Sequence, residues 1–211
     1  MKKLLFALSQ IVLFFSCSNK QQITLPYFNT SDFTPVWLNK NGPDYKNLHK
    51  VGPFSLIDQH GKVITERTTS GKIYVANFFF TRCENICPKM MDNLKRAATA
   101  FAADSNVLII SHSVTPVYDN VAVLKRYAEE KDINQPNWHL VTGDKDRIYN
   151  LARKSYFADT VTSSAITSTF LHTENLILVD KNRHIRGVYN GTIPFEVENL
   201  IRHISILEKE D

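Results

Sequence analysis

The sequence predicts an α/β fold with a central mixed sheet flanked by helices, and two observations lead to this prediction. First, the segments Ile73–Phe80 and Val107–Ile110 are nearly continuous apolar runs, which are typical of strands buried on both faces. Second, a segment with helical periodicity follows each run, and strand–helix–strand units imply parallel pairing through right-handed crossovers. A chain of 211 residues with 43% hydrophobic residues is large enough for one such domain.

The first half of the domain begins with a predicted hairpin. Residues 54–57 and 62–65 flank a turn-like stretch and are expected to be its two strands. After the first buried run, Pro88 suits the first position of a helix, where its missing N–H costs nothing. The side chains that follow repeat at spacings of three and four residues, which predicts one apolar helical face; they are Met91, Leu94, Ala98 and Phe101.

The second half continues the alternation. Asn120 is expected to cap a helix that reaches about Lys131, and Asp144 to cap a helix after a short strand at 139–142. Residues 176–179 and 184–189 flank turn residues as a closing antiparallel hairpin, and Pro194 opens the last helix. This is the element order of a thioredoxin-like fold: a central mixed sheet flanked by helices, with an N-terminal hairpin and a C-terminal antiparallel hairpin.

The N-terminal segment predicts export. Two lysines precede an apolar run at Leu4–Phe15, which is shorter than the roughly 20 residues that span a bilayer and is typical of a secretory signal. Ser16–Cys17 resembles the cleavage site of bacterial lipoproteins, which implies that Cys17 receives lipid. A plain cleaved signal or an uncleaved anchor is the alternative. We expect an exported, membrane-anchored lipoprotein that faces the periplasm or the cell exterior.

Three segments follow from this interpretation. Residues 1–16 are the predicted signal peptide, 17–50 a lipid-anchor tether with an irregular extension, and 51–211 the thioredoxin-like domain. Aromatic residues in the extension indicate that part of it packs on the domain. The net charge is +4 and falls to +2 once the two lysines of the signal are removed, so a nucleic-acid partner is not expected.

Two cysteines remain beside Cys17, and their position favours a function. Cys83 and Cys87 lie between a buried strand and a helix start, and ligands of open α/β sheets gather at the carboxyl ends of strands. A helix N-terminus stabilises a thiolate, so we expect a lowered pKa for Cys87 and also for Cys83. Thioredoxin-type pairs have two intervening residues. The three found here still permit a disulfide, but they also permit two sulfurs to converge on one soft ion such as Cu(I).

The residues around this pair resemble a known family. Phe78–Met90 reads FFFTRCENICPKM, and the Sco/SenC copper-chaperone family has the hallmark Phe-Thr-x-Cys-x-x-x-Cys-Pro followed by Met. Further matches extend the resemblance over about residues 51–206. It implies copper, as Cu(I) or Cu(II), bound by Cys83, Cys87 and His172. It also implies a role in maturing the copper centre of a respiratory oxidase, with the copper-accepting subunit of cytochrome c oxidase as partner.

One departure from the family pattern concerns a carboxylate. Thr115 stands before Pro116 where the family usually has Asp, which puts a role of that Asp in partner recognition in doubt. Asp119 is a candidate replacement.

Other side chains are given structural interpretations. His112 is interpreted as a packed or rim residue, and Met90 as core filling. Glu84 and Asn85 are expected to face a docking partner, and Thr81 and Arg82 to shape the loop, with Arg82 in reach of a thiolate. The remaining histidines are interpreted as surface residues; they are His49, His60, His139, His184 and His203.

Two functions remain open at this point. A metallochaperone, which is not an enzyme in the strict sense, would bind copper and deliver it to the oxidase. A thiol–disulfide oxidoreductase would instead reduce the acceptor's cysteines, with Cys83 attacking and with a thiol reductant as a further partner. A peroxidase of the same fold is the weakest hypothesis, because the sequence offers a symmetrical cysteine pair.

Overall fold

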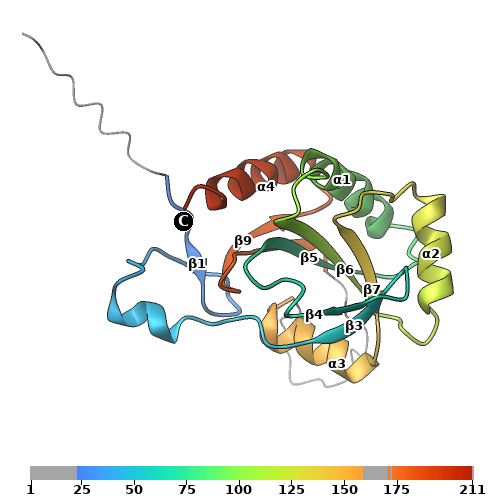
Figure 1. Ribbon diagram of the computed structural model, residues 1–211, viewed down its shortest axis with the longest axis horizontal. Helices are drawn as coiled ribbons and strands as arrows, with labels where there is room; N and C mark the ends of the chain where they lie inside the picture. Colours follow the sequence, from blue (N-terminus) through green and yellow to red (C-terminus); the bar gives the residue numbers. More distant parts are fainter. Residues whose placement is uncertain (1–22, 159–170, 172, 211) are drawn as a thin grey trace, which may run out of the picture.

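A single mixed sheet forms the centre of the computed structural model, which describes residues 23–158, 171 and 173–210 (Figure 1). Within these residues the strand order is β2-β1-β9-β8-β5-β6-β7-β3-β4. β5, β6 and β7 pair in parallel, and every other pairing is antiparallel. The strands are β1 (Tyr27–Phe28), β2 (Pro35–Val36), β3 (Ser55–Asp58), β4 (Val63–Thr65), β5 (Ile73–Phe79), β6 (Val107–Ser113), β7 (Trp138–Thr142), β8 (Asn175–Val179) and β9 (Ile185–Asn190). The predicted mixed sheet with two hairpins is therefore confirmed.

Helices cover both faces of this sheet. The α1 helix (Ile86–Ala100) and the α4 helix (Pro194–Leu207) pack together on one face, and α3 (Lys145–Asn150) lies on the other (Figure 1). The remaining helices are α2 (Val121–Glu130), a π-helical turn (Leu151–Ser155) and a 3-10 helix (Pro43–Asn47). Successive β5 side chains alternate between the two cores, and all seven are buried, as the apolar run predicted. Among the described helices, none combines the length and the apolar character that crossing a membrane requires.

The helix starts follow the sequence signals with one exception. Asn120 and Asp144 cap α2 and α3 as predicted, because their side-chain oxygens accept from the N–H groups of Val123 and Arg147 at 3.1 and 2.9 Å. Pro88, however, is not the first residue of α1, which begins at Ile86. Pro88 still lies in the first turn, where an N–H has no partner within the helix, so the helix tolerates it.

The N-terminal extension packs on the domain. The β1 strand joins the sheet beside β9, where Phe28 pairs with Ile185. Arg186, only 2% exposed, donates to the carbonyl of Leu25 at 2.6 Å and to the carboxylate of Glu210 at 2.8 Å. This arginine therefore ties the first and last parts of the described chain together.

Candidate metal centre

The cysteine pair lies just beyond the carboxyl end of β5, where the sheet is parallel. Cys83 is in the loop before α1 and is half-buried, whereas Cys87 is in the first turn of α1 and is 3% exposed. The backbone N–H of Cys87 donates to the Cys83 sulfur over 3.4 Å. Since the side chain of the N-cap residue Asn85 makes no capping bond, the Cys83 sulfur takes the place of a cap. The two sulfurs thus share one helix start, as the sequence predicted.

The two thiols are chemically unequal. Burial raises the pKa of Cys83, but hydrogen bonds from the Cys87 thiol and from backbone N–H groups outweigh burial and lower that pKa below its usual value. Burial and then the hydrogen bond with Cys83 raise the pKa of Cys87 to about 12. The expectation of a lowered pKa is therefore right for Cys83 and wrong for Cys87. The Cys87 side chain is part of the core between α1 and the sheet, and burial there opposes the effect of the helix N-terminus.

A buried carboxylate holds the loop that carries Cys83. Asp119 is fully buried, and its Oδ1 accepts from the Thr81 hydroxyl at 2.6 Å. Its Oδ2 accepts from the hydroxyls of Ser113 and Thr115 at 2.6 and 2.8 Å and from the Thr81 N–H at 3.2 Å. Asp119 is therefore a positioning residue that joins the end of β6 to the loop after β5. Thr115, the departure from the family pattern, contributes one of its donors, and Thr81 shapes the loop as predicted.

The structure also shows the surroundings of other residues near the cysteine pair. Glu84 and Asn85 are exposed, as expected of a surface that meets a partner. Arg82 stacks over the Tyr118 ring, 3.8 Å from its centroid. Met90 is fully buried among core side chains, which agrees with its interpretation as core filling.

His172 and Cys17 lie outside the described residues, so their predicted roles as copper ligand and lipidation site stay predictions. Within the described part of the chain, no group of three His, Cys, Asp or Glu side chains is arranged to hold a metal ion. The donors that this part does offer, two sulfurs at one helix start, are the soft ligands that Cu(I) prefers.

The remaining histidines divide into packed and surface residues. His112 is fully buried, so of the two interpretations, packed or rim residue, the first is confirmed. Its ring stacks on Phe78 at 4.9 Å between centroids. His184 was predicted to be a surface residue, which is wrong: it is 1% exposed, and its Nδ1 bonds the carbonyl of His49 at 2.9 Å. The N-terminal extension covers it. His139 is also mostly covered and pairs with Asp58 at 3.0 Å.

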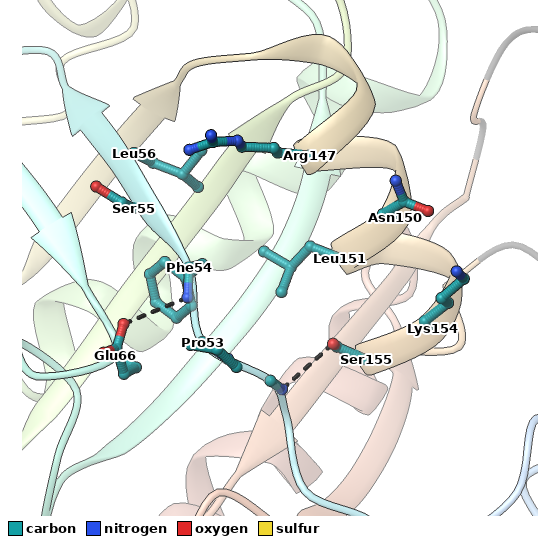
Figure 2. A pocket seen from close by; sticks show the side chains of 11 residues that line it. Pro53, Phe54, Ser55, Leu56, Glu66, Arg147, Asn150, Leu151, Lys154 and Ser155 are labelled. Atoms are coloured by element: carbon teal, nitrogen blue, oxygen red, sulfur yellow. Dashed lines mark hydrogen bonds between the residues drawn. The ribbon is translucent and has the colours of Figure 1, made fainter.

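A pocket of about 580 Å³ lies apart from the cysteines, between the segment before β3 and the turn after α3 (Figure 2). The carboxylate of Glu66 accepts from the Phe54 N–H at 3.3 Å, and the Ser155 hydroxyl accepts from the Gly52 N–H at 3.2 Å. These polar atoms are already engaged by backbone, and no cysteine or histidine lines the pocket. Among the described residues, the cysteine pair is therefore the better candidate for a metal centre.

Comparisons with known proteins identify the family of the chain. The SCO1/SenC family profile matches residues 43–206. The chain is 29% identical over 158 residues to the SCO1 protein homolog of Bacillus subtilis, covering 74% of this chain and 81% of that protein.

Solved structures extend the likeness to the fold. A SCO1/SenC family lipoprotein from Bacillus anthracis superposes with a TM-score of 0.66 at 25% identity, over 76% of this chain and 95% of that one. BsSco, described as a member of the Sco family of cytochrome c oxidase assembly proteins, gives 0.60 at 27% identity, over 74% and 94%. ScoI of Bradyrhizobium japonicum with copper bound gives 0.57 at 27% identity, over 73% and 99%. The thioredoxin-like fold prediction is confirmed by these structures.

Proposed function

Because the chain belongs to the SCO1/SenC family, we propose that it is a copper metallochaperone that binds copper through Cys83, Cys87 and His172 and delivers it to a respiratory oxidase. The observation that carries the proposal is the pair of sulfurs at the start of α1, where the N–H of Cys87 donates to the Cys83 sulfur. Copper-bound relatives and the link of the family to cytochrome c oxidase assembly support the choice of metal and of acceptor.

The geometry supports a site that both holds and releases its cargo. Cys87 is fixed in the core, whereas Cys83 is half-buried and its thiol has the lower pKa. Cys83 is therefore the ligand that an acceptor thiolate would displace first from the ion when ligands are exchanged one at a time. A third ligand from His172 would complete a site that remains open to such an exchange.

Export and anchoring form part of the same proposal. Residues 1–16 would be removed as a signal, Cys17 would carry lipid, and residues 17–50 would link the anchor to the domain, which faces the periplasm or the cell exterior. The lipoprotein from Bacillus anthracis supports this arrangement. The acceptor would be the copper-accepting subunit of cytochrome c oxidase.

Copper titration of the reduced protein tests the ligand set. We expect one copper per chain for the parent protein and a clear loss of Cu(II) affinity, with a changed absorption spectrum, for His172→Ala. The matched control is His60→Ala, because His60 is exposed in the turn between β3 and β4, away from the cysteines. Unchanged stoichiometry, affinity and spectrum in His172→Ala would remove His172 from the site.

A thiol–disulfide oxidoreductase is the second candidate. It is favoured by the contrast between an accessible thiol of lowered pKa at Cys83 and a buried thiol at Cys87, which is how an attacking and a resolving thiol differ. Rapid insulin reduction by a protein that binds no copper would reverse the order of the two proposals.

A further inference from the structure

A groove of about 440 Å³ opens beside the loop that carries Cys83. Three segments line it: Phe80 and Arg82 after β5, residues 114–118 after β6, and Lys145 with Tyr149 on α3. It therefore lies at the carboxyl ends of the parallel strands, where open α/β sheets gather their ligands. Arg82 is the residue directly before Cys83, so the groove adjoins the proposed copper site.

The rim of the groove exposes two large side chains, one aliphatic and one aromatic, to solvent. Val117 is 79% exposed and Tyr118 is 58% exposed. The Arg82 guanidinium lies 3.8 Å from the Tyr118 ring centroid, which holds the ring in place. Tyrosine and arginine are the residue types that contribute most to binding at protein interfaces, and a ring that is already held loses less entropy on binding.

The charged side chains that line the groove have one sign. Arg82 and Lys145 are both exposed, and no Asp or Glu side chain is among the lining residues. Asp119, which follows Tyr118, is fully buried among hydroxyl and N–H donors, and Asp144 and Asp146, which flank Lys145 in the chain, are exposed but do not line the groove. A partner segment that fits this groove therefore carries negative charge together with an apolar side chain.

We propose that the groove docks an acidic segment of the copper acceptor, with an apolar side chain of that segment against Val117 and Tyr118. This inference rests on the proposed function and adds the surface that the acceptor uses. Because Arg82 joins the groove to Cys83, a segment docked there would bring neighbouring acceptor thiolates close to an ion held by Cys83, the more accessible of the two cysteines. Docking thereby raises the rate of copper transfer without contributing a copper ligand.

The experiment measures binding and transfer separately. The full-length protein, in detergent and loaded with copper, is titrated with the purified copper-accepting domain of the oxidase from the same organism. The test variants are Lys145→Glu, which reverses a charge in the groove, and Val117→Ser, which removes its most exposed apolar side chain. The matched controls are Lys154→Glu, an exposed lysine that lines the pocket of Figure 2, and Val63→Ser, an exposed valine on β4.

We expect both test variants to bind one copper with parent affinity and to bind the acceptor domain about five- to tenfold more weakly at low salt. The loss for Lys145→Glu should shrink as salt is raised, whereas the loss for Val117→Ser should persist. Both controls should behave like the parent protein.

Three results would overturn the inference. Parent-like acceptor affinity in both test variants would show that the groove is not the docking surface, while the copper proposal would stand. An equal loss in Lys154→Glu would reduce the effect to general charge. Self-association that the Val117→Ser change abolishes, with no binding of the acceptor domain, would assign the groove to a second copy of the chain. Failure of the parent protein to bind copper would instead refute the proposed function.

Discussion

Replacing Asp119 tests whether the cysteine loop depends on one buried carboxylate. In Asp119→Ala, four donors lose their acceptor: the hydroxyls of Thr81, Ser113 and Thr115 and the N–H of Thr81. A hydrogen bond to a charged group contributes about 1.5–3 kcal/mol, and the bonds of one network are not additive. Because the carboxylate is fully buried and four donors depend on it, we expect a loss of about 3–5 kcal/mol in the free energy of unfolding.

A graded series makes this prediction sharper. In Asp119→Asn, an amide oxygen at the Oδ2 position keeps three of the four bonds, and the amide nitrogen faces the Thr81 hydroxyl, which can rotate to accept. The expected cost is about 2 kcal/mol, mainly from the lost charge. Thr115→Ala removes one donor and should cost about 1–2 kcal/mol. The expected order of loss is therefore Asp119→Ala, which removes four bonds and the charge, then Asp119→Asn, which removes the charge, then Thr115→Ala, which removes one donor.

Urea unfolding of the reduced protein measures these differences. With a slope of about 2 kcal/mol per molar urea, Asp119→Ala should lower the midpoint by about 2 M. Asp92→Asn is the control, because Asp92 is exposed on α1. The reasoning fails if Asp119→Ala unfolds within about 0.5 M of the parent protein. It also fails if the Asn variant is less stable than the Ala variant.

Three further predictions follow from buried and titrating groups. In native reduced protein at pH 7, iodoacetamide should modify Cys83 well before Cys87, whose pKa of about 12 keeps it protonated; equal labelling without denaturant would contradict this. Burial lowers the pKa of His112 to about 4, so the unfolded chain takes up a proton first as the pH falls below about 6.5. Stability that is complete above that pH is then lost toward pH 4, and between pH 7.5 and 5 the parent protein should lose about 2 kcal/mol more than His112→Phe, measured by urea unfolding. Arg186→Met leaves buried carboxylates unpaired, so a loss of about 3–5 kcal/mol and faster proteolytic release of the N-terminal extension are expected; unchanged proteolysis would show that other contacts hold the extension.

The parts of the fold that depend on local patterns were predictable from the sequence. The apolar run of β5, the N-caps Asn120 and Asp144 and the place of the cysteines at a helix start each depend on residues close together in the chain. The burial of His184 depends instead on the N-terminal extension, which returns to cover a turn about 135 residues away. Sequence patterns carry no signal for such a contact.

The candidate site shows the same division. Helix position alone favours a low pKa for both thiols, but Cys87 points into the core, and its burial outweighs the helix N-terminus. Two of the four bonds of Asp119 join it to Thr81, 38 positions away in the chain, so only the folded structure reveals why that carboxylate is buried. In the sequence, Asp119 is a candidate only because it follows Thr115; its burial requires partners from two separate segments, because charged side chains are seldom buried alone.

The position of Asp119 has a consequence for the energetics of metal binding. The loop that carries Cys83 is held at one end by the Asp119 bonds to Thr81 and at the other by the α1 helix, whose Cys87 is part of the core. Ordering a loop costs about 1–2 kcal/mol per residue in backbone entropy, and here folding of the protein supplies that order before any ion arrives. The binding free energy of an ion at the two sulfurs therefore does not have to fold the loop. A carrier gains from this arrangement, because its empty and loaded states can then share one loop conformation, and releasing the ion does not require the loop to unfold.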